Sequence, residues 1–404
     1  MKIKSILIAL SLMSLNAQAQ WYNYDVNKDG DVNVTDVTFL VNKILGEENP
    51  PPQLTFSVDQ KPYVYVDGPA STRRKTPVTT IESLNEFYIN STYELEPGYG
   101  LYSAPELRTY WAVVEGTDQG KWLVGDETTP GNGYWPNISE DNWDIIDVSF
   151  YAYANVNIKN SSSDQNVMFF CDGYKNTNRD VSMPYIHFIM DENGPETKDL
   201  LVAKKADNWQ NCKGHIFFHF EHACAAAQFF LVKTSKLENV DVMVKKAVLY
   251  NVMNDGKYFF NSDMNSPGSW SGVKHHDEDN RVKYTLWDGS GYTAVPAYTN
   301  NTSEMWQLTS STNPNSDYYF FIPQEFTPWD KSPISTNPSG SYIELECQIT
   351  PKDNSKSFGG KAYIPFTTAN TLQSGYAYPI IVKIGTGLLD ANGQKLFNSD
   401  GTIK

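Results

Sequence analysis

Apolar and polar side chains alternate with a period of two in several segments of the chain, and this pattern restricts the fold more than any other feature. In residues 341–349, one face would carry Ile343, Leu345, Cys347 and Ile349. The opposite face would carry Tyr342, Glu344, Glu346 and Gln348. The same period occurs in residues 151–158, 216–220, 240–244 and 380–384. Strands with one packed and one wet face are typical of antiparallel β-sandwiches, so the sequence predicts an all-β fold.

Short turn signals separate these segments, namely Asn193-Gly194, Asn254-Asp255-Gly256, Asp288-Gly289 and Asn392-Gly393. The chain has 404 residues, which is enough for two domains that each bury a core. A polar stretch rich in Asn, Ser, Pro and Gly occupies residues 260–272. We therefore predict two sandwich domains, residues 76–265 and residues 266–404.

The first residues have the features of a secretory signal. Lys2 and Lys4 flank the start of an apolar run, and Ala17-Gln18-Ala19 forms a small-residue cleavage site before Gln20. No Cys lies near that site, so the sequence offers no residue there for a lipid anchor. No later stretch stays apolar for the roughly 18 residues that a transmembrane helix needs. We predict that residues 1–19 are a signal peptide and that the protein is secreted or held at the outer cell surface.

Residues 25–36 read D-V-N-K-D-G-D-V-N-V-T-D, the pattern of a calcium-binding loop. Calcium takes about six to eight oxygen ligands, which such a loop supplies at fixed positions. Gly30 falls at the sharp turn, where a residue that tolerates positive φ is favoured. The predicted ligands are Asp25, Asn27, Asp29, Asp31 through its backbone carbonyl, Asn33 through water, and Asp36. The alternative is a polar turn without metal; we expect bound Ca²⁺.

The loop leads into a short predicted helix, whose apolar face consists of Val37, Leu40, Val41, Ile44 and Leu45. Gly46 is placed to end this helix, and the prolines at 50–52 prevent its resumption. Too few residues precede the loop for an entering helix, and Asp36 stands where an EF-hand has Glu. Residues 20–49 instead resemble one repeat of a type I dockerin, without the usual second repeat. That resemblance implies a cohesin-like partner.

Charge and cysteine content exclude other classes. The formal net charge of −15 argues against nucleic-acid binding, which depends on cationic contacts to phosphate. Four cysteines in so long a secreted chain are not a disulfide framework: Cys171, Cys212, Cys224 and Cys347. A bridge between Cys212 and Cys224 stays open, while Cys224 and Cys347 lie in apolar contexts that fit buried thiols.

Six segments carry a family resemblance through their order and spacing. They are residues 72–79 (T-R-R-K-T-P-V-T) with the apolar positions up to Phe87, residues 199–203 (D-L-L-V-A), residues 216–223 (I-F-F-H-F-E-H-A), residues 244–256, residues 321–324 (F-I-P-Q) and residues 375–378 (G-Y-A-Y). Together they resemble the fimbrillin-like proteins, the type V pilins and relatives of gut and oral anaerobes. The resemblance covers residues 55–404.

The resemblance implies two tandem transthyretin-like sandwiches that act as a pilus subunit or surface adhesin. In pilins of this family an N-terminal strand is removed by cleavage after an arginine. A strand of the next subunit then fills the vacated groove through main-chain hydrogen bonds. Arg73 or Arg74 is the matching position, and residues 54–66 are strand-like. Residues 50–75 would thus be a linker with a removable strand; alternatively, the two arginines only decorate that linker.

Three departures from the family pattern favour a tip, accessory or non-polymerising member. The lipoprotein Cys is absent from the predicted cleavage site. Cleavage at Arg73 or Arg74 would discard the calcium module. Residues 397–404 show little apolar alternation, so they would make a poor donor strand.

We do not expect an enzyme, because no nucleophile elbow, phosphate loop or zincin motif appears in the sequence. The segment H-x-x-x-H-x-x-H, formed by His215, His219 and His222, would suit zinc on a helix. On a strand, His215 and His219 point to one face and His222 to the other, so three-fold coordination is not expected.

Aromatic residues are numerous, with 10 Trp, 25 Tyr and 20 Phe. Exposed Trp and Tyr rings suit sugars, and Trp135 and Trp143, in an aromatic-rich stretch, are candidate glycan contacts. The alternative is that these rings fill the sandwich cores.

Overall fold

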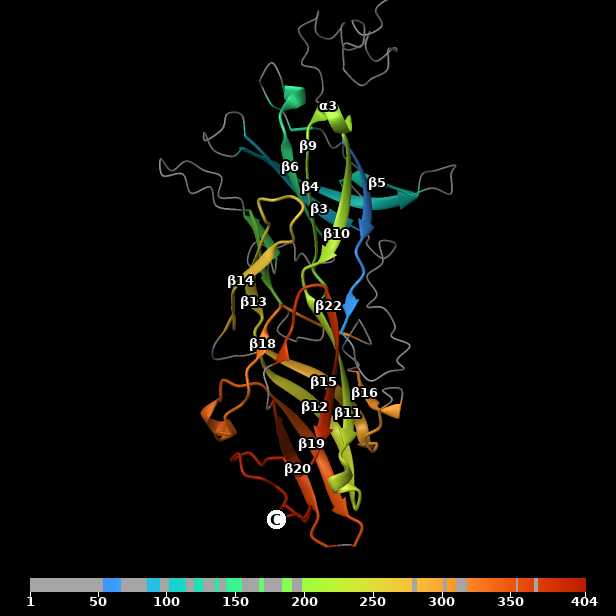
Figure 1. Cartoon of the computed structure of the whole chain (residues 1–404), viewed down its shortest axis with the longest axis vertical. Helices are drawn as coiled ribbons and strands as arrows, with labels where there is room; N and C mark the ends of the chain where they lie inside the picture. The colour runs from blue at the N-terminus through green and yellow to red at the C-terminus, as the bar shows by residue number, and fades with distance from the viewer. Residues whose placement is uncertain are drawn as a thin grey trace, which may run out of the picture.

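The computed structural model describes residues 54–66, 86–94, 102–113, 120–125, 135–136, 138, 143–154, 167–170, 184–190, 198–277, 282–300, 304–309, 318–353, 355–366 and 370–404. The predicted signal peptide, the calcium module of residues 20–49, and Arg73 and Arg74 lie outside these residues. β-Strands are the main secondary structure of the described chain, which forms an elongated molecule (Figure 1). The predicted all-β class is confirmed.

The largest sheet formed by the described residues has the strand order β1-β10-β9-β6-β3-β4-β5. Its strands are β1 (Thr55–Gln60), β3 (Glu86–Tyr93), β4 (Tyr102–Val113), β5 (Gly120–Val124), β6 (Val148–Ala154), β9 (Leu201–Asp207) and β10 (His215–His222). The sheet curls so that its two outermost strands, β1 and β5, come into contact (Figure 1). β1 therefore lies in a slot between β10 and β5.

An aromatic core, called the N-terminal core below, fills the inside of this curl. Phe87 of β3 is fully buried and has four aromatic neighbours. Its ring stands edge-on to those of Phe56, Trp122, Phe218 and Phe220, with centroid distances of 6.1, 4.7, 6.0 and 5.6 Å. Edge-to-face pairs add about 0.5–1.5 kcal/mol each beyond the burial of apolar area. This cluster is what holds the curl closed.

A second sheet, in the order β14-β13-β8-β7, packs on the outer face of the curl. Its strands are β7 (Val167–Phe170), β8 (Tyr185–Ile189), β13 (Asp255–Phe259) and β14 (Ser269–Lys274). Tyr151 of β6 meets Phe260 at a ring distance of 5.0 Å, and Ile186 and Phe188 of β8 are buried in the same cluster. The two sheets together form the N-terminal sandwich.

The C-terminal sandwich consists of two further sheets. One has the order β15-β12-β19-β20, with β12 (Val240–Val252), β15 (Val282–Ala294), β19 (Tyr342–Pro351) and β20 (Phe358–Pro365). The other has the order β16-β11-β22-β2, with β17 also paired to β11. Its strands are β2 (Val64–Tyr65), β11 (Ala225–Lys233), β16 (Trp306–Leu308), β17 (Tyr319–Phe321) and β22 (Tyr376–Ile384).

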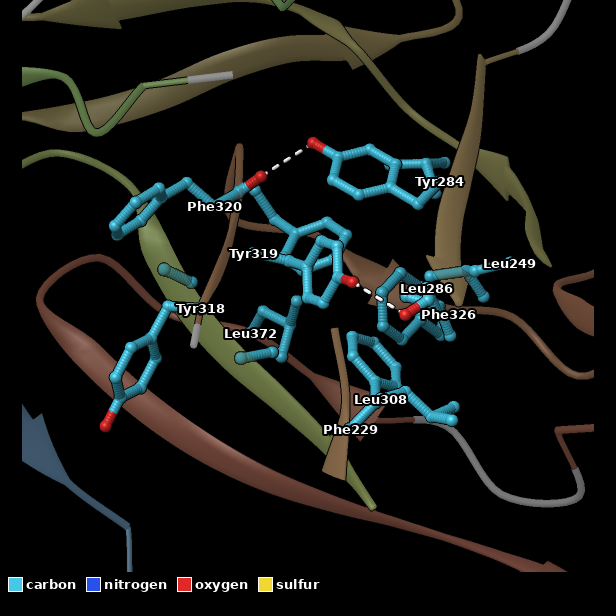
Figure 2. Close-up of a cluster of buried hydrophobic side chains, with 14 of the residues drawn as sticks. Phe229, Leu249, Tyr284, Leu286, Leu308, Tyr318, Tyr319, Phe320, Phe326 and Leu372 are labelled. Atoms are coloured by element: carbon cyan, nitrogen blue, oxygen red, sulfur yellow. Dashed lines mark hydrogen bonds between the residues drawn. The ribbon is translucent and has the colours of Figure 1, made fainter. Parts of the chain in front are cut away.

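Aromatic and aliphatic side chains fill the space between these two sheets (Figure 2). Tyr284 stacks on Phe321 at 4.6 Å, and its hydroxyl donates to the Phe320 carbonyl at 2.6 Å. The Tyr319 hydroxyl donates to the Leu286 carbonyl at 2.9 Å. Both buried hydroxyls are therefore satisfied, which removes the free-energy cost of burying an unpaired polar group.

Helices are short in the described part of the chain: α3 (Trp209–Cys212) and the 3₁₀ turns Trp143–Ile145, Ser235–Leu237 and Ile334–Thr336. α3 begins after Asn208, whose side chain accepts a hydrogen bond from Asn211 N at 3.0 Å. It ends at Lys213, which has the left-handed conformation. A small two-stranded antiparallel sheet, β18 (Glu325–Phe326) with β21 (Asn370–Thr371), completes the described strands.

The chain crosses between the two sandwiches several times. Only Ala223 and Cys224 separate β10, in the N-terminal sandwich, from β11, in the C-terminal one. Residues 253–254 likewise join β12 to β13, which returns to the N-terminal sandwich. The boundary predicted between residues 265 and 266 does not match this pairing, because residues 225–252 belong to the C-terminal sandwich and residues 255–274 to the N-terminal one.

The predicted alternation in residues 341–349 is confirmed, since Ile343, Leu345, Cys347 and Ile349 are all buried. Tyr342 is also buried, in a small separate cluster with Trp329 and Tyr363. Most strand pairs are antiparallel, as the predicted sandwiches imply, but β1 pairs with β10, and both β11 and β2 pair with β22, in parallel. Asp288-Gly289, predicted as a turn between strands, instead lies within the single strand β15.

Asp255 begins β13, directly after residues 253–254, where the chain returns to the N-terminal sandwich. Its carboxylate accepts hydrogen bonds from His187 Nε2 at 2.8 Å and His276 Nδ1 at 3.0 Å. Burial raises the pKa of Asp255, but these hydrogen bonds and the nearby charge of Lys274 outweigh it, so the pKa lies below its usual value. The Asp255 side chain is buried, whereas that of His276 is about half exposed.

We expect Asp255→Asn to lower the free energy of unfolding at pH 7 by about 1–3 kcal/mol, because it removes charge-assisted hydrogen bonds. The folded-state pKa is depressed, so the contribution is complete above the unfolded value of about 3.9 and is lost as pH falls through the folded pKa. Urea unfolding at several pH values should show wild-type stability falling more steeply below about pH 4 than that of the variant. The exposed Asp241 supplies the control Asp241→Asn; equal pH profiles for Asp255→Asn and wild type would contradict the assignment.

Candidate functional site

Residues 54–66 form one extended segment that lies across both sandwiches (Figure 1). β1 pairs in parallel with β10, from Thr55 opposite His215 to Gln60 opposite Phe220. Lys61 N then donates to the Phe220 carbonyl at 2.8 Å. β2 continues in parallel beside β22, where Val64 N donates to Gly375 O at 2.8 Å and Val66 N to Ala377 O at 3.0 Å. The segment is thus held mainly through backbone hydrogen bonds to two strands of different sheets.

The inward side chains of this segment enter the cores. Leu54 and Phe56 are buried in the N-terminal core, and Phe56 stacks on Phe218 at a ring distance of 6.1 Å. Tyr63, between β1 and β2, is 5% exposed and belongs to the cluster that runs into the C-terminal sandwich. Removing the segment would therefore open apolar surface in both sandwiches.

The outward side chains pair with β10 and fix the register. His215 contacts Thr55 Oγ1 through Nδ1 and Ser57 Oγ through Nε2, both at 2.9 Å. Asp59 pairs with His219, and Lys61 with Glu221 at 3.3 Å. These groups are exposed, where ion pairs contribute about 0–1 kcal/mol. They therefore select the alignment of the strand more than they stabilise it, since a one-residue slip would turn every side chain to the wrong face.

Where the segment passes from one sandwich to the other, it covers a buried polar group. The His222 ring is bonded through Nδ1 to Asp199 Oδ2 at 2.5 Å, and its Nε2 lies 3.1 Å from the Gln60 side-chain amide. The ring of Tyr63 stacks on His222 at 3.7 Å. If Nδ1 donates to the Asp199 carboxylate, Nε2 is free to accept from the Gln60 amide. We call Gln60, Tyr63, Asp199 and His222 the junction cluster.

The Tyr63 hydroxyl and the neighbouring Cys224 thiol both stay protonated at neutral pH. Burial, and then the charge of Asp199, raises the pKa of the Tyr63 hydroxyl well above its usual value; that hydroxyl donates to the Cys224 carbonyl at 3.4 Å. The same two causes raise the pKa of the Cys224 thiol. A neutral buried thiol is a poor nucleophile, so Cys224 serves packing and not chemistry.

A groove of about 650 Å³ continues from the end of this segment. β11 pairs with one side of β22 along the strand, but β2 pairs with the other side only at Tyr376 and Ala377. In the described residues no strand pairs with 378–384 on that side, and Pro379 within this stretch is typical of an edge strand. The groove beside it, called the β22 groove below, is mainly apolar and is lined by residues that include Val66, Ile364, Phe366, Leu372, Ile380 and Leu388.

No family model matches the chain, and no curated protein matches it. Solved structures do. A fimbrial protein from Bacteroides vulgatus is 14% identical with a TM-score of 0.46, over 82% of this chain and 95% of that one. A fimbrial assembly protein from Parabacteroides distasonis is 12% identical with a TM-score of 0.32, over 77% of this chain and 90% of that one. At this level of likeness we argue the function from the contacts of the chain itself.

The structure separates the predicted histidine cluster as expected. His215 and His219 are exposed on one face of β10, and His222 is buried on the other. Within the described ranges, no group of three His, Cys, Asp or Glu side chains could hold a metal ion. Cys212 and Cys224 are free thiols, so the bridge between them is not formed. No helix of the described residues is long and apolar enough to span a membrane.

The two tryptophans proposed as glycan contacts have different outcomes. Trp135 is 1% exposed and packs edge-on against Phe150 and Trp209 at 5.5 and 5.7 Å. It therefore offers no ring face to a sugar, and the alternative that aromatic residues fill the core is correct for it. The backbone of Trp143 begins a 3₁₀ turn, but its side chain lies outside the described part.

The junction cluster was missed by sequence reasoning, although its members were visible. Asp199 stands 23 positions before His222, and Gln60 162 positions before it, so no local pattern links them. The one available signal was that His222 falls on the apolar face of its strand, where a histidine needs a buried partner.

Proposed function

We propose that the protein is a non-enzymatic, fimbrillin-like protein of the outer cell surface, structural or adhesive in role. Residues 54–66 are its removable strand, and the slot that this strand occupies accepts a strand from another subunit. The observation that carries the proposal is the parallel pairing of β1 and β2 with β10 and β22, which bridges both sandwiches at their edges.

The contacts support exchange in two ways. Backbone hydrogen bonds do not depend on side-chain identity, so a different strand could make them; the pockets of Leu54 and Phe56 then give specificity. An empty slot would expose apolar groups such as Phe87 and Phe218, and refilling it is favourable by about 25 cal/mol per Å² of apolar surface covered. A longer incoming strand could also pair with residues 378–384 and cover the β22 groove.

The place of the protein in an assembly is a further part of the proposal. We favour a tip, accessory or non-polymerising member over a shaft subunit. Phe397 is buried and bridges to Ile403, so residues 397–403 are folded back on their own sandwich. A segment held in this way would have to detach before it could act as a donor strand.

The exchange can be tested with the purified full chain after cleavage by an arginine-specific protease. We expect a labelled peptide of residues 54–66 to replace the cleaved segment and to co-elute with the protein. The same peptide with Phe56→Asp is the matched control and should not be retained, because its carboxylate would be buried in the N-terminal core. Retention of both peptides, or of neither, would count against strand exchange.

We propose that residues 25–36 bind Ca²⁺ through the predicted oxygen ligands Asp25, Asn27, Asp29, Asp31, Asn33 and Asp36. The ion would fold only its own module, because binding energy at such a loop is folding energy for the residues that supply the ligands. We expect chelation to remove the helical signal of residues 21–46 and to leave the melting of the sandwiches unchanged. Circular dichroism with and without chelator measures the helical signal, and calorimetry measures the melting; a shift of the main transition would contradict this independence.

A docking role for the same module is the second candidate. The observation that favours it is the dockerin-like order of the loop and the following helix. Calcium-dependent capture of a cohesin-like surface protein by the full chain, lost in an Asp25→Ala/Asp29→Ala variant, would support it. Capture that persists in chelator would exclude it.

A further inference from the structure

A cleft on the C-terminal sandwich is built around an irregularity in β15. Lys246 of β12 pairs with Asp288, and Val244 pairs with Thr293. One residue of β12 therefore faces four residues of β15, Gly289, Ser290, Gly291 and Tyr292, which bulge out of the ladder. Bulges of this kind re-aim side chains at the edges of sheets. Here the bulge contributes Tyr292, which is 37% exposed, to the lining of the same cleft as Trp287.

The bulge rests directly on the Trp287 indole. A Cβ added at Gly289 would lie 2.9 Å from Trp287 Nε1 and 3.0 Å from its Cζ2, closer than side chains pack. Trp287 is fixed from another side by Trp306, edge-on at a ring distance of 5.1 Å. Because β15 and β16 are edge strands of opposite sheets, this contact joins the two sheets at the side of the sandwich. The Trp287 ring is therefore held rigidly in place.

The cleft has a volume of about 560 Å³, which is in the range of small-ligand sites. It combines the aromatic rings of Trp287 and Tyr292 with the carboxylate of Asp288 and with hydroxyl side chains, those of Ser290, Thr293 and Thr309. Lys246 donates to Asp288 Oδ2 at 2.8 Å, and the Asp288 side chain is still 47% exposed. The carboxylate is thus oriented by the protein and open to a ligand.

We propose that this cleft, called the Trp287 cleft, binds a neutral saccharide. A pyranose ring has an apolar C–H face that packs on an aromatic ring and a rim of hydroxyls that bond to carboxylate and hydroxyl groups. A purely apolar ligand would bury Asp288 and the hydroxyls without partners, which is unfavourable. An acidic sugar would meet the Asp288 carboxylate and a chain of net charge −15.

This inference does not rest on strand exchange. The residues that line the Trp287 cleft belong to β15, apart from Thr309, which directly follows β16, and none of them lines the slot of residues 54–66 or the β22 groove. The protein would bind sugar whether or not it polymerises, so failure of one proposal leaves the other standing.

The test is titration of the full chain with neutral oligosaccharides of glucose, galactose, mannose and N-acetylglucosamine, and with polygalacturonate as the acidic comparison. Binding is followed by tryptophan fluorescence and by calorimetry. We expect a neutral oligosaccharide to bind and Tyr292→Ala to weaken it at least about tenfold, equal to about 1.4 kcal/mol. Asp288→Asn should weaken it as well, and polygalacturonate should not compete.

Tyr298→Ala is the matched control, because Tyr298 is 40% exposed on the same sandwich and does not line the cleft. It should leave affinity unchanged. Thermal melting of each variant confirms that the fold is kept. The proposal is overturned if no neutral oligosaccharide binds, if polygalacturonate binds instead, or if Tyr292→Ala and Tyr298→Ala have the same affinity.

Discussion

A His222→Ala variant is expected to lose about 3–5 kcal/mol of stability, because the Asp199 carboxylate would stay buried after losing its hydrogen bond to the His222 ring. The side chains of His222 and Asp199 are 3% and 0% exposed, and 2.5 Å separates Nδ1 from Oδ2. The substitution also removes the ring on which Tyr63 stacks and the acceptor of the Gln60 amide. We therefore expect residues 54–66 to become easier to release as well as the whole chain to unfold earlier.

His219→Ala is the matched control for this variant. It removes a histidine from the same strand that also pairs with a carboxylate, Asp59, but both side chains are about half exposed. An exposed pair of this kind is worth about 1 kcal/mol or less. Denaturant unfolding of the two variants measures the difference; equal losses would mean that burial at the junction is not what stabilises the pair.

Phe56→Ala is expected to cost about 3–5 kcal/mol, the usual range for truncating a buried phenylalanine. Phe56 is 7% exposed and contacts both Phe87 and Phe218. The loss should appear first as local opening of β1. As an edge strand, β1 is hydrogen-bonded to β10 alone, so it can detach while the rest of the sheet stays intact. Hydrogen exchange of the β10 amides that face β1 measures this opening.

The neighbouring Ser57→Ala provides the comparison for Phe56→Ala. Ser57 points outward and bonds His215 at 2.9 Å at an exposed position. Its loss should change stability by about 0.5 kcal/mol, as for most surface substitutions. If β10 exchange were unchanged in Phe56→Ala, β1 would not be held by its core side chains, and the proposed specificity of the slot would fail.

The sequence predicts only some of the features on which His222→Ala and Phe56→Ala act. Local alternation was enough to predict the strands, as Ile343 to Ile349 show, and to place His222 on the opposite face of β10 from His215 and His219. The strand character of residues 54–66 was also visible. The pairing of those residues in parallel with strands about 160 and 310 positions later was not, because the register is set by tertiary contacts and no short-range pattern encodes it.

For a related reason, the predicted domain boundary does not follow the strand pairing. Ala223 and Cys224, where the chain changes sandwich, lie between two apolar strands and carry no turn signal. The polar residues 260–272, which suggest a boundary in the sequence, belong to a loop and an edge strand within the N-terminal sandwich. The other crossing, at residues 253–254, does coincide with a turn signal, but such a signal does not distinguish a change of sandwich from a hairpin.

The local sequence likewise does not determine which aromatic residues are buried. Trp135 and Trp287 both sit in polar, glycine-containing surroundings in the sequence, yet Trp135 is fully buried and Trp287 lines an open cleft. Asp288-Gly289 has the sequence of a hairpin turn but forms a bulge, because β15 continues to pair with β12 on both sides of it. Tertiary contacts, and not the local sequence, distinguish these cases.

The central claim is that residues 54–66 are a removable strand, and the N-terminus of the native protein tests it most directly. Mass spectrometry of the protein recovered from the cell surface should find a chain that begins immediately after Arg73 or Arg74, with residues 54–66 and the calcium module absent. A chain that begins at Gln20 and keeps both would contradict the account.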